Sequence, residues 1–164
     1  MNFHWHSVWL CRFLLYICSP KIKQFGELRV FSPQDTSKGG TWLGLNEFGL
    51  FVGITNRYTP SPNNALTSRG IITQKALEAK TPSKALEKLS QLNPKDFNPF
   101  HLLITNREET SILWSDGEKF TQFKVIENIF ILTESSFGAG ENKRSSFLKS
   151  QIDQLPDKEA IEPF

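Results

Sequence analysis

The 164-residue chain has few cysteines, few tyrosines and little net charge. Its two cysteines, Cys11 and Cys18, are too few for a disulfide scaffold or a zinc site, so we expect both to be reduced. The net charge of +2 at pH 7 provides no basic stripe for nucleic acid. The sequence also lacks a phosphate-binding loop, a serine-nucleophile elbow and an HExxH metal motif, so none of these three kinds of site is expected.

A long hydrophobic run is also missing. The longest apolar stretch, residues 8–18, is about half of the roughly 20 residues that span a bilayer, and Arg12 divides it. It does not match a signal peptide, because a positively charged start is absent. We expect a buried strand or an unrelated start of the chain rather than a membrane anchor, and we expect a cytoplasmic protein.

Phenylalanine, by contrast, is abundant. The chain has 14 phenylalanines and 4 tryptophans against 2 tyrosines, and most of these rings should lie in a core or a contact surface. The length fits a single domain. We divide the chain into an atypical apolar segment at 1–27, one α+β domain at 28–155 and a tail at 156–164.

The pattern of apolar and turn residues predicts the order strand, hairpin, two helices, four strands and a last helix. This order is typical of an α+β fold with an antiparallel sheet and segregated helices. The helix starts are predicted from Ser68 as a cap and from Thr81 followed by Pro82. The expected strands cover residues 28–31, 41–45, 50–55, 100–105, 111–115, 120–126 and 129–133, and the expected helices cover 69–79, 82–92 and about 142–155.

The hairpin at residues 41–55 carries apolar side chains on both faces. A strand without a polar face belongs in a sheet that is covered on both sides, so we expect both faces of the hairpin to be hidden from water. Gly44 and Gly53 interrupt its strands, and interior glycines mark the close approach of another group. Trp42 is a candidate for that group. Gly49 is expected to take a positive φ in the turn.

Polar residues at the end of this hairpin are candidates for a site. The amide N–H of Asn56 is suited to stabilising a developing oxyanion, and Arg57 is suited to holding a carboxylate through two hydrogen bonds. Asp35, in the preceding loop, could orient such an arginine. Turn chemistry explains the same residues equally well, because asparagine is common where a strand runs into a loop.

Three segments resemble a known family. They are GGTWLGLNEFGLFVGITNR at 39–57, SRG at 68–70 and LTESSFGAGENKR at 132–144, and in this order they resemble the NRDE-motif family, also called the transport and Golgi organisation protein 2 family. The resemblance covers residues 28–150. It implies an αββα sandwich of mainly antiparallel sheets like that of N-terminal nucleophile (Ntn) hydrolases, in which an N-terminal cysteine attacks an amide with its own α-amino group as base.

The chain departs from that family pattern at several places. Position 2 is Asn2 rather than cysteine, and the Asn-Arg-Asp-Glu tetrapeptide is absent upstream of residue 39. The similar NREE at 106–109 follows the glycine-rich block instead of preceding it. We therefore expect a family-like protein of undefined activity that lacks the hydrolase nucleophile, with a fold incomplete at its N- and C-terminal ends.

Two alternatives remain open. The first is an Ntn-type amidohydrolase acting on a C–N amide bond, with Asn56 as oxyanion donor and a cysteine exposed by processing. The second is a non-catalytic protein for haem binding or haem trafficking, for which the aromatic content and the two arginines Arg57 and Arg69 are the motive. A small amide or a haem-like molecule is thus the expected ligand, with no resident cofactor and no metal. The expected ligand-binding residues are Asp35, Trp42, Arg57 and Arg69.

Overall fold

The computed structural model describes residues 17–127, 129–135 and 143–154, and only the backbone of Ile17 and Cys18. The chain divides into two units, Met1–Val125 and Ile126–Phe164, and each is described by itself. The predictions for Cys11 and for residues 8–16 lie outside the described residues.

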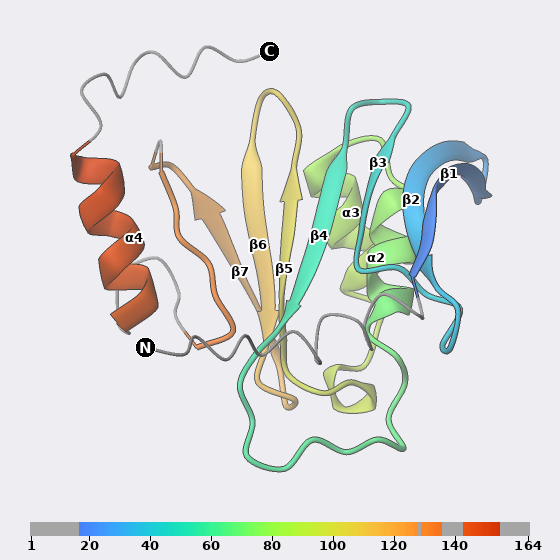
Figure 1. The fold of residues 1–164 in the computed structure, drawn as a ribbon. Helices are drawn as coiled ribbons and strands as arrows, with labels where there is room; N and C mark the ends of the chain where they lie inside the picture. The colour runs from blue at the N-terminus through green and yellow to red at the C-terminus, as the bar shows by residue number, and fades with distance from the viewer. Residues whose placement is uncertain (1–16, 128, 136–142, 155–164) are drawn as a thin grey trace, which may run out of the picture. The chain divides into compact units, whose positions relative to one another are not determined.

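The first unit is built on a seven-stranded antiparallel sheet (Figure 1). Every strand pairs with its neighbour in the chain, so the spatial order equals the sequence order, as in a meander. The strands are Ile17–Phe25 (β1), Leu28–Asp35 (β2), Leu43–Asn46 (β3), Phe51–Asn56 (β4), Phe100–Thr105 (β5), Thr110–Ser115 (β6) and Phe120–Val125 (β7).

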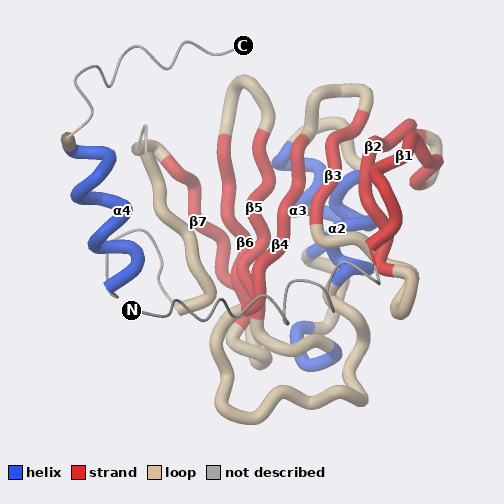
Figure 2. Tube along the Cα trace, viewed as in Figure 1, coloured by secondary structure: helices blue, strands red, loops and turns tan. Residues whose placement is uncertain are grey.

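Two helices lie against one face of this sheet (Figure 2). Helix α2, Gly70–Leu77, packs on β3 and β4, whereas α3, Pro82–Leu89, packs on β5 and β6. A short 3-10 turn, η1 at Pro94–Asp96, leads back into the sheet. The core between helices and sheet consists of apolar side chains from both layers: Val30, Leu50, Val52, Ile72, Ala76, Leu77, Ala79, Ala85, Leu89, Phe97, Phe100, Leu102, Ile104 and Leu113.

The two helix starts differ from each other. Helix α3 begins as predicted, because the Thr81 hydroxyl accepts a hydrogen bond from the backbone N–H of Lys84 at 3.3 Å and Pro82 occupies the first position. The prediction for α2 is wrong by one residue. Arg69 directly precedes the helix and makes no side-chain cap, while the Ser68 hydroxyl accepts only a long 3.4 Å contact from the N–H of Gly70.

The predicted hairpin is confirmed as β3 and β4, and Gly49 in its turn has a φ of +77°. The expectation that both of its faces are hidden is wrong. The face toward α2 is dry, and Val52 there is 0% exposed. The opposite face, on which consecutive strands place Phe31 beside Leu45, leaves these side chains 52% and 45% exposed.

The two hairpin glycines do mark close approaches, but Trp42 is not the approaching group. A Cβ at Gly44 would lie 2.7 Å from Leu77 Cδ1 of α2, and a Cβ at Gly53 would lie 3.3 Å from the ring of Phe51. Leu77 therefore packs into the space that the absent side chain of Gly44 leaves on the helical face.

Strand β1 is an element that the sequence pattern did not predict, and it lies within the range 1–27. The strand predicted at 129–133 does not form, since only Leu132 makes an isolated bridge. The second unit contains α4, Lys143–Asp153, close to the predicted last helix. The α+β class with an antiparallel sheet is confirmed, and the described residues supply one sheet and one helical layer. Within the described part of the chain, no helix has the length and apolar character needed to cross a membrane.

Candidate functional site

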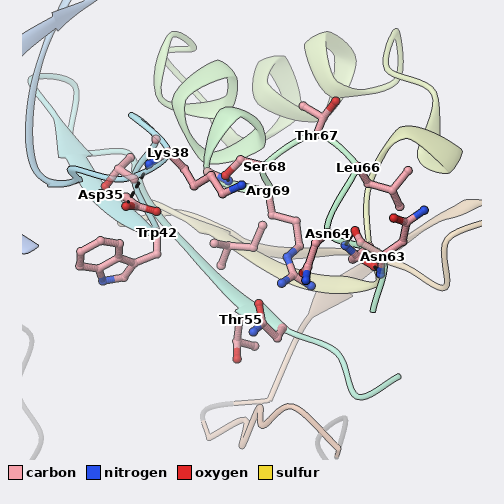
Figure 3. A pocket seen from close by; sticks show the side chains of 16 residues that line it. Asp35, Lys38, Trp42, Thr55, Asn63, Asn64, Leu66, Thr67, Ser68 and Arg69 are labelled. Carbon is pink, nitrogen blue, oxygen red and sulfur yellow. Dashed lines mark hydrogen bonds between the residues drawn. The ribbon is translucent and has the colours of Figure 1, made fainter. Parts of the chain in front are cut away.

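A cavity of about 460 Å³ lies where the loop between β2 and β3, the end of β4 and the start of α2 meet (Figure 3). Four of the five predicted site residues, Asp35, Trp42, Asn56 and Arg69, line it, and Arg57 does not. The other described lining residues are Lys38, Gly40, Thr41, Ile54, Thr55, Asn63, Asn64, Leu66, Thr67, Ser68, Gly70 and Asn98.

Two glycines let the first wall of the cavity form. A Cβ built on Gly40 would lie 2.8 Å from the Cα of Gly70, and a Cβ built on Gly70 would lie 2.9 Å from the backbone nitrogen of Thr41. Both distances are too short for a real side chain, and the atoms met are backbone atoms that cannot rotate away. The loop and the start of α2 therefore touch backbone to backbone, which brings residues 35–42 beside Arg69.

Asp35 holds the loop in shape. Its Oδ1 accepts hydrogen bonds from Ser37 N at 2.8 Å, Ser37 Oγ at 2.6 Å and Lys38 N at 3.2 Å. The backbone of Asp35 also pairs with the glycines, through Asp35 N to Gly40 O at 2.8 Å and Gly39 N to Asp35 O at 2.7 Å. Partial burial alone would raise the pKa of Asp35, but the hydrogen bonds from Ser37 and Lys38 outweigh it and hold the pKa below its ordinary value.

Arg69 is the half-buried cation of the cavity. Its Nη1 donates to the carbonyl oxygen of Pro99 at 2.9 Å, and no acidic side chain among the described residues forms an ion pair with it. Burial lowers the pKa of the Arg69 guanidinium, with no contribution from an opposite charge. The group nevertheless stays protonated near neutral pH, because arginine has an intrinsically high pKa. A charge thus faces the cavity without the partner that a half-buried cation normally has.

Asn56 and Arg57 point to different places. Asn56 is the last residue of β4, and its exposed side chain lines the cavity. Arg57 turns to the other side of the sheet, where its guanidinium carbon lies 4.2 Å from the ring centre of Trp114 in a cation–π contact. The two predicted partners therefore do not form one site, and Asp35 does not hydrogen-bond to either arginine in the described structure.

The outer wall comes from the loop between β4 and α2, whose role the sequence analysis missed. Asn63 and Asn98 bond reciprocally: Asn63 N donates to Asn98 Oδ1 at 2.8 Å, and Asn98 Nδ2 donates to Asn63 O at 2.7 Å. Thr67 N donates to Asp96 O at 2.9 Å and adds a second attachment. The signal in the sequence is the asparagine pair at 63–64, a composition that is common in turns and does not by itself indicate a site.

Most of the side chains that line the cavity are polar. Only Trp42, Ile54 and Leu66 among the described lining residues carry apolar side chains. None of these lining residues is a histidine, cysteine, methionine or tyrosine, and within the described ranges no group of three or more acidic, histidine or cysteine side chains could hold a metal ion. The arrangement is therefore suited to binding a polar molecule through arginine and amide donors.

Comparisons with known proteins agree with the resemblance seen in the sequence. The family model described as Transport and Golgi organisation 2 matches residues 21–162. No curated relative matches the sequence. Among solved structures, penicillin V acylase from Agrobacterium tumefaciens is similar at 17% identity with a TM-score of 0.46. That alignment covers 64% of this chain and only 38% of the acylase.

Proposed function

Since the chain belongs to the Transport and Golgi organisation 2 family, whose model covers both the glycine-rich loop and the start of α2, we propose that these segments form a binding site for a small organic carboxylate. Arg69 binds the carboxylate group in the cavity. The observation that carries the proposal is the half-buried Arg69 guanidinium, which lines the cavity and lacks an acidic partner among the described residues.

The geometry of Arg69 supports this role physically. A guanidinium presents several N–H donors in a rigid plane that matches a carboxylate, and such charge-assisted pairs are about twice as strong as neutral hydrogen bonds. The bond from Nη1 to Pro99 O fixes the orientation of the plane before a ligand arrives. Little side-chain entropy is then lost on binding. A bound carboxylate also compensates the desolvated charge of Arg69.

Two amide side chains extend the same donor surface. Asn56 and Asn64 line the cavity, and neither side chain makes a hydrogen bond within the described structure. Their N–H and C=O groups can bind an amide or hydroxyl of the ligand. Haem is a poorer fit, because only three apolar side chains line the cavity, whereas a porphyrin exposes two broad apolar faces.

The amidohydrolase alternative has less support from the described cavity. An Ntn mechanism needs a cysteine made N-terminal by processing, and no cysteine is among the described lining residues, whose hydroxyl groups come from Thr41, Thr55, Thr67 and Ser68. The Thr41 hydroxyl already donates to Leu43 O at 2.8 Å. Binding is accordingly the function that we propose, in a cytoplasmic protein as the low cysteine content favours.

Isothermal titration calorimetry with the full chain tests the proposal. The probes are short- and medium-chain carboxylates, the neutral amides of the same acids, and haem. We expect a carboxylate to bind and its amide to bind more weakly. Arg69→Gln should lower carboxylate affinity by about 10- to 100-fold, because a hydrogen bond to a charged group contributes roughly 1.5–3 kcal/mol.

Arg107→Gln is the matched control. Arg107 is an exposed arginine in the turn between β5 and β6, outside the cavity, so its replacement should leave carboxylate affinity unchanged. The proposal is contradicted if no carboxylate in the panel binds, or if Arg69→Gln and Arg107→Gln have the same effect. Binding of haem that Arg69→Gln weakens and Arg107→Gln leaves unchanged would favour the haem alternative instead.

A further inference from the structure

Asp35 has one carboxylate oxygen to spare. Its Oδ1 accepts all three of the hydrogen bonds that hold the loop, from Ser37 N, Ser37 Oγ and Lys38 N. Its Oδ2 has no hydrogen-bond or ion-pair partner within the described structure. Oδ1 is thus occupied by the hydrogen bonds of the loop, whereas Oδ2 is available to a ligand.

Asp35 lines the same cavity as Arg69, but the two charges do not neutralise each other. They lie apart in the cavity, with Asp35 beside Trp42 and the guanidinium of Arg69 toward Asn64 (Figure 3). No ion pair joins them. The described lining carries one acidic side chain, Asp35, and two basic ones, Lys38 and Arg69. Because Asp35 and the half-buried Arg69 do not pair, the cavity is complementary to a small molecule that carries both charges.

The charge of Asp35 is present at neutral pH. The hydrogen bonds from Ser37 and Lys38 hold the pKa of Asp35 below its ordinary value of 3.8 against the opposing effect of burial. Lys38 also lines the cavity, and its charge contributes to the lowered pKa of Asp35, but its side chain is exposed and forms no ion pair with Asp35. Water screens the charge of an exposed lysine, and exposed ion pairs are weak, so an ammonium group of a ligand can still bind Asp35.

We infer that the ligand of this cavity is a zwitterion of the amino-acid type, whose ammonium group donates to Asp35 Oδ2 while its carboxylate is held by Arg69. This inference rests on the proposed function, because it takes the carboxylate position from Arg69. It adds the ammonium group of the ligand and names Asp35 as the residue that recognises this group. The volume of about 460 Å³ falls in the ordinary range for small-molecule sites.

The test compares ligands that differ only in one charge. The probes are α-amino acids such as phenylalanine and leucine and ω-amino acids of increasing chain length, each with its deaminated acid and its decarboxylated amine. Calorimetry on the full chain should show that an amino acid binds about tenfold or more tightly than its deaminated acid, and that the amine alone binds weakly. The preference for the amino acid over the deaminated acid is the quantity that the inference predicts.

Asp35→Asn is the decisive variant, because its amide oxygen can still accept the backbone bonds of Ser37 and Lys38 and preserve the loop. The variant should lose the preference for the amino acid while binding the deaminated acid as the unmodified chain does. Asp116→Asn is the matched control. Asp116 holds its own turn in the same way, with Oδ1 accepting from Glu118 N at 2.9 Å and Lys119 N at 3.0 Å, but it lies outside the cavity.

The outcomes separate the two proposals. If deaminated acids bind as tightly as amino acids and only Arg69→Gln weakens them, the zwitterion is refuted and the carboxylate site stands. If Asp35→Asn weakens both ligand types equally, Asp35 acts only through the loop and the inference is likewise refuted. If neither ligand type binds, the proposed function fails and the inference fails with it. Loss of the preference in Asp35→Asn, together with its retention in Asp116→Asn, supports the inference.

Discussion

The Asn46 side chain joins the hairpin to the end of α2 through hydrogen bonds, and its replacement tests the fold most directly. Its Nδ2 donates to Leu77 O at 3.0 Å and to Ala79 O at 2.7 Å, and its Oδ1 accepts from Phe48 N at 3.0 Å and Leu50 N at 3.1 Å. The side chain thus satisfies two carbonyls at the helix end and two N–H groups of the turn. It is only 4% exposed, so water does not replace these bonds easily.

The expected loss follows from these four bonds. Each contributes about 1 kcal/mol net, and a buried group left without a partner costs about 1–3 kcal/mol. The N–H of Phe48 can turn to water because that residue is half exposed, so roughly three of the four bonds count in full. Asn46→Ala should therefore lower the free energy of unfolding by about 3–4 kcal/mol, a large part of the roughly 5–15 kcal/mol of a typical domain.

Urea unfolding followed by circular dichroism measures this loss. Asn64→Ala is the control: Asn64 is exposed and makes no hydrogen bond within the described structure, so its replacement should change the free energy by less than about 0.5 kcal/mol. Asn46→Asp should be at least as damaging as Asn46→Ala at neutral pH, because it sets a carboxylate against two carbonyls. The reasoning is refuted if Asn46→Ala costs less than about 1 kcal/mol.

Two further predictions concern the same hairpin. Leu50→Ala should lower the free energy of unfolding by about 2–5 kcal/mol, because Leu50 is 0% exposed on the helical face. Leu45→Ala should lower it clearly less, because Leu45 is 45% exposed on the other face. Equal losses in urea unfolding would contradict this and show that both faces are covered. Hydrogen bonds from the backbone and side chain of Arg29 lower the pKa of Glu47 below its ordinary value of 4.5, so its stabilising contribution is present above that pH and is lost as the pH falls through the lowered pKa. Glu47→Gln should therefore reduce Tm near neutral pH and have a shrinking effect in acid, whereas Glu108→Gln, in an exposed turn, should not; a Tm difference that is constant with pH would contradict this assignment.

Much of the fold was predictable where the local chemistry of the residues and their burial favour the same secondary structure. The cap at Thr81, the proline that follows it and the glycine at the hairpin turn each require one backbone geometry, and the structure has it. Strand β1 was not predicted because neither of its faces is consistently apolar. Lys21 and Lys23 lie on one face, and Ile22 on the other face is 71% exposed. The exposure of the second face of the hairpin was also not predicted, because a sequence shows that side chains are apolar but not whether another element covers them.

The candidate site was predictable in part for a related reason. Asn56 and Arg57 were interpreted as a pair because they are adjacent in sequence. In the folded chain Asn56 lines the cavity, whereas the guanidinium of Arg57 lies over the ring of Trp114, so neighbours in the sequence are not neighbours in the site. Arg69 takes the position expected for Arg57, and only the folded chain brings it there from beyond the intervening loop.

The contact between Gly40 and Gly70 explains why two separate motifs serve one site. The residues that resemble the family at this contact, GGTW and SRG, are mostly small. The structure gives Gly40 and Gly70 a steric reason, since a Cβ on either would meet backbone at 3 Å or less. The glycines themselves offer no side chain to a ligand. Their close contact places the loop held by Asp35 against the residue after Arg69, so that Asp35 and Arg69 line a common cavity. It follows that the motif specifies the approach of two backbones, and that the binding chemistry we propose depends on that approach.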